Sequence, residues 1–494
     1  MLRKPFCLVL LIAAGLLLPA QAVRAQAQEP KATRLPITVK DVDASLENEW
    51  FGLYVQGKKI GYMYSGRAKV EENGVTIYRE KLRMTMKLQS AGQKTELLVE
   101  QTMDFEGKPP FRLLKGDYLS KNEQITEHIT LAAKGKGYEA FITVGGNNQK
   151  KTVELDFNLA DSMSSELWLK NQPKIGDKIT SSDLDMEDLK IYLVTAELAA
   201  TKVSVVNGVK VKFHEVKSLS HKNNITSESR YDEKGQLLSG SIAGLLEMRR
   251  ESEEDAKNTE FSSDLFVLGM AKLDKGIGET DRLNGLILEY ESKDGPIFPD
   301  FSRQTVVDKG KGVYQIRLGK DNGKKVKATE KEIKDGQSET LAYPIKDAKV
   351  LELAKKAAGD AKTDLDKAKN ICKFVKDYIR PQLAASAPKM HDLMERKEGD
   401  CKSYALMFTC LARAAGLTSR EVSGFVYMGD GILAFGGHAW NEVLLDGYWV
   451  PVDASMNQVD ADAQHICLGT DKESSSNLLK TFGKLNFKVI EVQR

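Results

Sequence analysis

Three residues in the last quarter of the chain have the types and the order that amide acyl transfer requires: Cys401, His438 and Asp453. A thiolate attacks the carbonyl, an imidazolium protonates the departing amine, and a carboxylate fixes the imidazole tautomer and stabilises its charge. A His and an Asp alone are better interpreted as a hydrogen-bonded pair in a core. A nucleophile, a base and an orienting acid together favour a catalytic site.

Cys401 stands directly before a segment with helical spacing. In EGDCKSYALMFTCLARAAG, which runs from Glu398 to Gly416, apolar residues recur every three or four positions and the final glycine ends the helix. The sequence therefore predicts Cys401 at a helix N-terminus. There, unsatisfied backbone N–H groups and the positive end of the helix dipole stabilise a thiolate relative to a thiol, and the same groups can bind a tetrahedral oxyanion.

His438 and Asp453 belong to two strands that we expect to pair. The segment GGHAWNEVLLDGYWVPVDAS reads as a hairpin around the two-residue turn Asp446-Gly447. This register places Trp440 opposite Asp453 and His438 diagonal to Asp453 on the same face, within reach of a hydrogen bond. A bulge at Pro451, which lacks a ladder donor, would change the register by one residue.

The rest of the chain suggests β-rich regions followed by helices. Alternating short strands and turns predict an antiparallel β-rich domain over residues 31–264, in which two similar strand–turn–strand segments leave an internal duplication open. Residues 265–340, with Gly-rich turns, predict a β-rich connecting domain. Beyond them the period becomes helical, with a capping-box pattern at Thr363 and Asp366 and a helix that ends before Pro381.

The block of residues 396–468 resembles the transglutaminase-like superfamily, whose members carry a Cys at a helix start, a His-x-Trp segment and a downstream Asp on strands. GDCKSYA, GGHAWNEV and WVPVD match these motifs in order and spacing. The resemblance implies a papain-like α+β domain, which we place at residues 341–494 after the β-rich regions. It also implies roles for five residues: Cys401 as nucleophile, His438 as general acid/base, Asp453 as orienting residue, and Trp440 and Asn441 as residues that line or brace the site. Packing explains the last two equally well.

The expected activity is cleavage of a peptide, isopeptide or other amide bond through a thioester acyl-enzyme. Hydrolysis comes first because water needs no dedicated acceptor site. Transfer to an amine, as in a protein-glutamine transamidase, is the alternative and requires a second groove. A non-catalytic cell-envelope scaffold with a structural triad is the third interpretation. The expected partner is a protein, a peptide or a cell-envelope polymer.

The N-terminus predicts export. A short basic segment, an apolar run and small-residue sites before residue 25 are typical of a cleavable signal peptide over residues 1–25. An uncleaved N-terminal anchor is the alternative, although the apolar run is shorter than the ~20 residues of a membrane span. We expect a periplasmic or secreted protein with no membrane span after cleavage.

The charge balance argues against nucleic acid as a partner. The chain has 494 residues, enough for about two to four domains, with 72 Lys and Arg against 70 Asp and Glu. Nucleic-acid-binding proteins usually concentrate positive charge. We therefore expect no nucleic-acid partner.

The remaining cysteines and acids suggest no cofactor and no metal. Cys372, Cys410 and Cys467 lie in apolar stretches and are expected in the core, with their disulfide state left open. Asp460 and Asp462 are the nearest pair of carboxylates to a calcium site and are interpreted as solvated turn residues. His465 follows this acidic turn and could form a hydrogen bond there.

Overall fold

The computed structural model describes residues 31–470, 481 and 485–494, except 56, 91–92, 123–125, 145–146, 207–208, 223–224, 260–268, 281–282, 294, 320–326, 341 and 383–388. The predicted signal peptide lies outside the described residues. In the part that is described, we find no helix with the length and apolar character needed to cross a bilayer.

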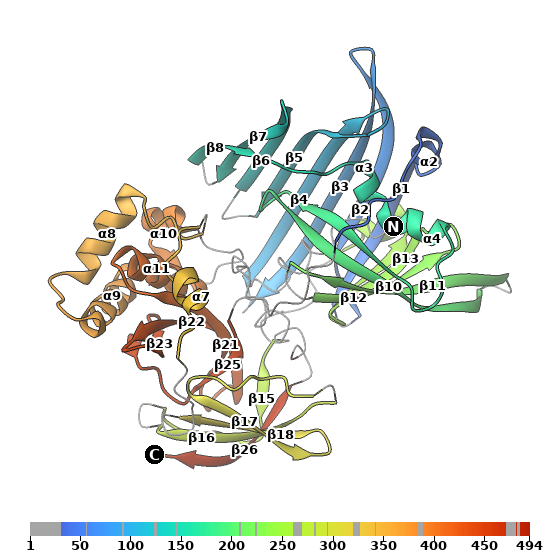
Figure 1. Cartoon of the computed structure of the whole chain (residues 1–494). Coiled ribbons are helices and arrows are strands. Elements are labelled where there is room, and N and C mark those ends of the chain that lie inside the picture. Colours follow the sequence, from blue (N-terminus) through green and yellow to red (C-terminus); the bar gives the residue numbers. More distant parts are fainter. Residues whose placement is uncertain are drawn as a thin grey trace. The chain divides into compact units, whose positions relative to one another are not determined.

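The described residues form two compact units, one of residues 31–259 and one from residue 269 onward (Figure 1). The N-terminal unit is built on one fourteen-stranded sheet in the order β8-β7-β6-β5-β4-β3-β2-β1-β14-β13-β12-β11-β10-β9. Within β1 to β8 and within β9 to β14, strands that follow one another in the sequence are neighbours in this sheet, and β1 joins the two runs by pairing with β14. Its strands are β1 (Glu47–Val55), β2 (Lys58–Glu72), β3 (Val75–Ser90), β4 (Gln93–Glu106), β5 (Leu113–Lys121), β6 (Thr126–Lys134), β7 (Gly137–Val144), β8 (Asn147–Val153), β9 (Lys178–Asp185), β10 (Lys190–Val206), β11 (Val209–Ser220), β12 (Ile225–Asp232), β13 (Leu237–Ile242) and β14 (Leu246–Glu251).

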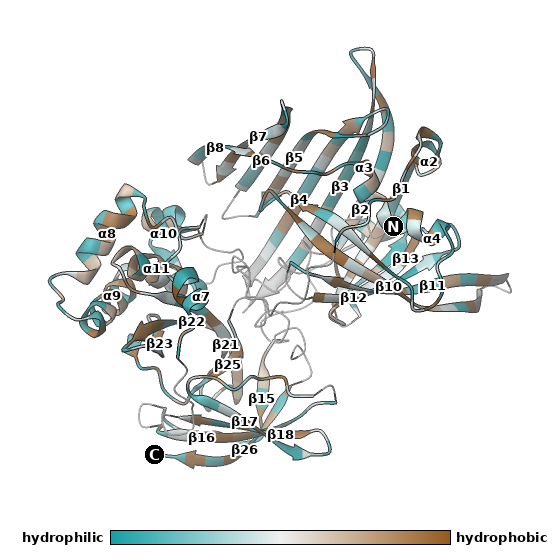
Figure 2. Cartoon of the chain, in the orientation of Figure 1, coloured by the Kyte–Doolittle hydropathy of each residue, from teal (hydrophilic) through white to brown (hydrophobic). Residues whose placement is uncertain are grey.

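The prediction of an antiparallel N-terminal β region is confirmed by the pairing of these strands. Strand β12 shows why the sequence folds this way, because buried and exposed residues alternate along it, as expected for a sheet with one face in a core. Figure 2 shows similar changes of hydropathy along β10. Short helices α2 (Val39–Asp43), α3 (Leu159–Ser162), α4 (Ser164–Lys170) and α5 (Glu253–Lys257) accompany the sheet. The internal duplication stays a prediction.

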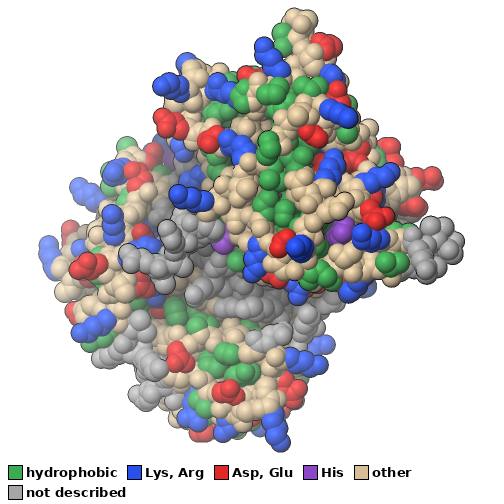
Figure 3. All heavy atoms as spheres, turned by 45° about the vertical axis from the view of Figure 1, so that its right-hand side comes forward, with side chains coloured by type: hydrophobic (Ala, Val, Ile, Leu, Met, Phe, Trp, Pro, Cys, Tyr) green, Lys and Arg blue, Asp and Glu red, His purple; other side chains and the backbone are tan. Residues whose placement is uncertain are grey.

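One face of the molecule mixes charges of both signs among the described residues. Lys and Arg side chains are interspersed with Asp and Glu on the face in Figure 3. This pattern agrees with the near-equal totals of basic and acidic residues in the sequence.

The C-terminal unit contains a ten-stranded sheet in the order β17-β18-β16-β26-β15-β22-β21-β25, with β23 paired to β22 and β24 paired to β23. Its strands are β15 (Ala271–Leu273), β16 (Gly285–Glu291), β17 (Gln304–Gly310), β18 (Val313–Gly319), β21 (Ser419–Tyr427), β22 (Ala434–Leu445), β23 (Tyr448–Asp453), β24 (Gln458–Val459), β25 (His465–Gly469) and β26 (Asn486–Gln493); β19 (Arg380–Pro381) and β20 (Glu398–Gly399) form a separate short pair.

The segment that we predict as a connecting domain, residues 265–340, contributes strands to this same sheet. Strand β15 pairs with β22, and β16 pairs with β26 at the end of the chain. The two segments therefore share one sheet, and a domain boundary at residue 340 stays a prediction.

Among the described residues of the C-terminal unit, the helices that precede or flank the strands are α7 (Glu330–Asp335), α8 (Ala348–Ala358), α9 (Asp364–Tyr378), α10 (Met390–Arg396) and α11 (Cys401–Ala414). Helix α9 begins where predicted, because the Thr363 hydroxyl accepts a hydrogen bond from the Asp366 amide at 3.1 Å. The apolar faces of α8, α9 and α11 pack in one core with Val443 of β22 and Val452 of β23. This core fixes the helix of Cys401 against the hairpin of His438 and Asp453. The finer papain-like topology stays a prediction.

Candidate active site

Helix α11 begins at Cys401, as the sequence predicts. Its N-cap is Asp400, whose carboxylate accepts hydrogen bonds from the amides of Lys402 at 3.1 Å and Ser403 at 3.4 Å. The expectation that the first amides of this helix are unsatisfied is therefore wrong for these two. The Asp400 carboxylate also opposes the positive end of the helix dipole. Stabilisation of a Cys401 thiolate must consequently come largely from another group.

The hairpin of β22 and β23 has the register that the turn predicts. Asp446 and Gly447 both have positive φ, 50° and 82°, as a type I′ turn requires. The strands pair from there without a bulge, and Pro451 lies opposite Glu442. As a result His438 Nε2 lies 2.7 Å from Asp453 Oδ2, a charge-assisted hydrogen-bond distance.

Burial and charge together set the protonation of this pair. The side chains of His438 and Asp453 are only 8% and 1% exposed. Burial alone lowers the pKa of His438, but the charge of Asp453 and its hydrogen bond, together with Cys401, raise that pKa to about 10. For Asp453 burial alone raises the pKa, yet His438 and His465 hold it well below the usual carboxyl range. An imidazolium–carboxylate pair therefore persists at neutral pH.

Cys401 lies beside His438, since a hydrogen bond to its side chain is one of the causes that raise the pKa of His438. Because Nε2 faces Asp453, Nδ1 is the ring nitrogen left for the thiol. Cys401 is partly exposed, whereas Cys372, Cys410 and Cys467 are buried, and all four are free. Burial raises the pKa of Cys372 and of Cys410 to about 12. Cys401 is thus the thiol suited to react with a molecule from solution.

Trp440 and Asn441 occupy different places around this group. The Trp440 ring stacks on His438, with centroids 6.1 Å apart and planes at 20°. The Asn441 side chain points to α11, where it donates to Ala405 O at 2.9 Å and to Thr409 Oγ1 at 2.7 Å. Trp440 therefore contacts the imidazole directly, and Asn441 joins β22 to the helix that begins at Cys401.

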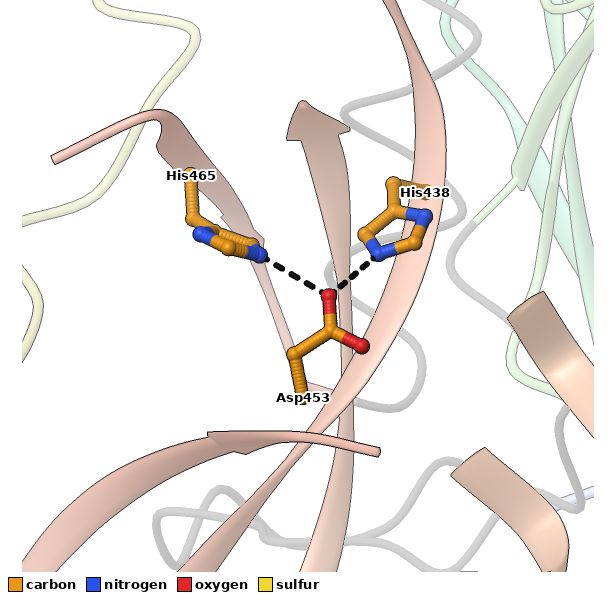
Figure 4. Close-up of side chains that lie close together, drawn as sticks. All are labelled: His438, Asp453 and His465. Carbon is orange, nitrogen blue, oxygen red and sulfur yellow. Dashed lines mark hydrogen bonds and ion pairs between the residues drawn. The ribbon is translucent and has the colours of Figure 1, made fainter. Parts of the chain in front are cut away.

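A second histidine, His465 on β25, lies at the same carboxylate. Its Nε2 is 3.0 Å from Asp453 Oδ2, the oxygen that His438 also approaches (Figure 4). The signal for His465 in the sequence is weak: its place after an acidic turn predicts only a hydrogen bond within that turn. Its Nδ1 does lie near that turn, 3.5 Å from Asp462 Oδ1. The contact with Asp453 was not anticipated.

His438 and His465 each present a ring nitrogen, and Asp453 presents a carboxylate oxygen. Such atoms can bind a metal ion, and these three lie within 4.8 Å of one another. The two N–O separations of 2.7 and 3.0 Å match hydrogen bonds. We assign the group as hydrogen-bonded. Asp462 holds Gln458 and Gln464 through its carboxylate, so it is more than a solvated turn residue.

Comparison with known proteins supports the resemblance seen in the motifs. Residues 351–454 match the model of the Transglutaminase-like superfamily. A segment of 115 residues is 30% identical to human kyphoscoliosis peptidase and covers 21% of this chain and 17% of that protein. The match thus spans less than a fifth of the relative's length.

Two solved structures are similar at low sequence identity. The "Putative Cysteine Protease" from Cytophaga hutchinsonii is 11% identical, with 43% of this chain and 84% of that chain covered and a TM-score of 0.27. The periplasmic domain of TgpA from Pseudomonas aeruginosa, bound to ethylmercury, is 10% identical, with 60% and 94% covered and a TM-score of 0.24. The sequence match and the motifs identify residues 351–454 as a transglutaminase-like domain.

Proposed function

We propose that this protein is a cysteine hydrolase of the transglutaminase-like type, which cleaves a peptide, isopeptide or other amide bond. Cys401 is the nucleophile, His438 the general acid and base, and Asp453 the residue that orients and charges His438. The observation that carries the proposal is the 2.7 Å hydrogen bond between His438 Nε2 and Asp453 Oδ2, buried behind a partly exposed cysteine.

The reaction begins with an ion pair between the Cys401 thiolate and the His438 imidazolium. The sulfur attacks the carbonyl carbon, and a C–S bond forms as the carbonyl π electrons move to oxygen. When the tetrahedral intermediate collapses, the C–N bond breaks and His438 Nδ1 gives its proton to the departing amine. A thioester remains on Cys401. Water then attacks the thioester carbon while His438 takes a proton from the water. The C–S bond breaks, the carboxylic acid product is released, and the Cys401 thiolate forms again.

Asp453 is well suited to its proposed role. Its Oδ1 accepts hydrogen bonds from the Ser455 amide at 2.8 Å, the Ser455 hydroxyl at 2.7 Å and the Met456 amide at 3.2 Å. These bonds hold the carboxylate in one orientation, with Oδ2 directed at His438. A fixed carboxylate keeps the imidazole in the tautomer that presents Nδ1 to the thiol.

The substrate class follows from the proposed chemistry. We propose an exported protein that acts on a protein, a peptide or a cell-envelope polymer, and the N-terminal β-rich unit would bind or position that polymer. Gly437, next to His438, is exposed, and a Cβ atom there would meet nothing within 4 Å. This open backbone gives an extended substrate chain room beside the catalytic histidine.

A simple activated ester tests the acyl-enzyme without knowledge of the natural substrate. p-Nitrophenyl acetate should acetylate Cys401, detected by peptide mass spectrometry, and the acetyl group should be lost at a rate indifferent to added methylamine. Faster loss with formation of N-methylacetamide would favour amine transfer. Absence of acetyl-Cys401, with Cys401→Ala indistinguishable from the wild type, would favour the scaffold interpretation and overturn the proposal.

A further inference from the structure

The carboxylate of Asp453 serves two imidazoles, and the proposed reaction uses only one of them. His438 and His465 both direct Nε2 at the same oxygen, Oδ2, at 2.7 and 3.0 Å (Figure 4). The two rings lie 5.8 Å apart between centroids. His465 has a side chain only 5% exposed, so solvent does not screen it from its neighbours.

His465 is held from the side opposite to Asp453 by a second acid. Its Nδ1 lies 3.5 Å from Asp462 Oδ1. Asp462 is fixed in turn by the amide of Gln464 at 3.0 Å and by the side chains of Gln458 and Gln464, both at 2.8 Å. The Trp440 ring meets the edge of His465, with centroids 5.2 Å apart. Each ring nitrogen of His465 thus lies near a carboxylate, and Trp440 packs against the ring.

The result is a line of groups in which acid and base alternate: Asp462, His465, Asp453, His438 and Cys401. Such an order lets each imidazolium be flanked by negative charge. Burial alone lowers the pKa of His465, but the hydrogen bond to Asp453 and the nearby Asp462 carboxylate raise it, while the charge of His438 opposes the rise. His465 therefore tends to carry a positive charge close to the pair of Asp453 and His438.

A positive charge there has a specific consequence for catalysis. Asp453 stabilises the proton on His438, but a general acid must also release its proton to the leaving amine, and it works best when its pKa is near the working pH. A cation that shares the Asp453 oxygen weakens the attraction between Asp453 and His438. A packing histidine in the core would need neither the shared oxygen nor a second acid behind it.

We propose that His465, held by Asp462, is a positioning residue that fixes the Asp453 carboxylate and weakens its hold on the His438 proton. This inference rests on the proposed function, because it assigns His465 a part in the proton transfer of the same site. It acts through Asp453 and makes no contact with the substrate.

The test compares alkylation of Cys401 by iodoacetate and by iodoacetamide over a range of pH in the full chain. The anionic reagent is attracted by the His438 imidazolium and the neutral one is not, so the ratio of the two rates reports the charge of His438. This ratio should be high while His438 is protonated and fall at the alkaline end of its titration. Peptide mapping separates Cys401 from the buried cysteines.

His465→Gln is the informative variant, because it can still donate to Asp453 but cannot become charged. We expect the alkaline fall of the ratio to move upward by roughly one pH unit, since a positive neighbour of His438 is lost. Asp462→Asn, which weakens the charge of His465, should move it in the same direction. His465→Ala also removes the hydrogen bond, and it should slow alkylation at neutral pH roughly tenfold, with partial recovery in His465→Gln.

The inference is overturned if the profile of His465→Gln coincides with that of the wild type or moves to lower pH. If His465→Ala does not fold, the Gln variant and Asp462→Asn decide the outcome. Failure of the proposed function has a different signature: the wild-type ratio would then be flat with pH and equal to that of His438→Gln. In that case the triad itself, and the role of His465 with it, would be rejected.

Discussion

Replacing Asp453 by Asn tests how far the carboxylate controls His438. The pKa of His438 rises from 6.5 to about 10 although burial alone lowers it, and the charge of Asp453 is the largest cause of the rise. The rise corresponds to roughly 5 kcal/mol of preference for the imidazolium. Asp453→Asn removes the charge and keeps the size of the side chain. Burial then dominates, and we expect the pKa of His438 to fall below 6.5, so that most molecules carry a neutral imidazole at pH 7.

NMR of protein with isotope-labelled histidine measures this directly, because the chain has only six histidines. The resonance of His438 is assigned by its absence from His438→Gln. Asp117→Asn is a matched control, since Asp117 lies 3.1 Å from His128 Nε2 but both side chains are about half exposed, at 54% and 44%. Solvent screening makes that pair weak, and Asp117→Asn should leave the titration of His438 as it is in the wild type. An unchanged titration of His438 in Asp453→Asn would show that the carboxylate does not control the charge of His438.

The free energy of unfolding should depend on pH through the same histidine. Because its pKa is raised in the folded protein, the stabilisation from His438 is complete below pH 6.5 and is lost as the pH rises through about 10. Urea unfolding of the wild type and His438→Gln should therefore differ most at low pH; a constant difference would contradict this. Asn441→Ala should lower the free energy of unfolding by roughly 1–3 kcal/mol because two buried hydrogen bonds are lost, whereas Asn370→Ala, at an exposed hydrogen bond, should have little effect. Equal urea midpoints for these two variants would argue against the bracing role. EDTA should leave the alkylation rate of Cys401 unchanged, because the His–Asp–His group is hydrogen-bonded; a changed rate would point to a bound metal ion.

The local parts of the site could be predicted from the sequence. A capping residue and an apolar period of three to four residues determine where α11 begins, and so where Cys401 lies. The Asp446-Gly447 turn determines the register of β22 and β23, and with it the approach of His438 to Asp453. Both depend on interactions between residues close in the sequence.

The remaining features depend on pairing between distant segments. His465 reaches Asp453 because β25 pairs with β21, with His465 opposite Val426, and no turn connects those two strands. Strand β16 likewise pairs with β26 at the far end of the chain. The pattern of apolar residues in a single sequence predicts which face of such a strand is buried, but it does not predict which distant strand pairs with it.

The role of Asp400 could not be predicted from the sequence either. A helix start was expected to leave its amides unsatisfied beside Cys401, yet the N-cap carboxylate takes up those of Lys402 and Ser403. An acidic N-cap stabilises a helix well, but it also occupies the first backbone amides and opposes the positive end of the helix dipole, so the helix start stabilises another anion less. The activation of Cys401 is therefore assigned mainly to His438.

The assignment of a cysteine hydrolase is tested by the rate of iodoacetamide alkylation at Cys401 below neutral pH, in the wild type and in His438→Gln, with the buried Cys410 as an internal reference. An activated thiolate–imidazolium pair predicts fast alkylation of wild-type Cys401, a large decrease in His438→Gln and almost no reaction at Cys410. Slow alkylation of Cys401, equal to that of Cys410 and indifferent to His438, would contradict the proposed cysteine hydrolase.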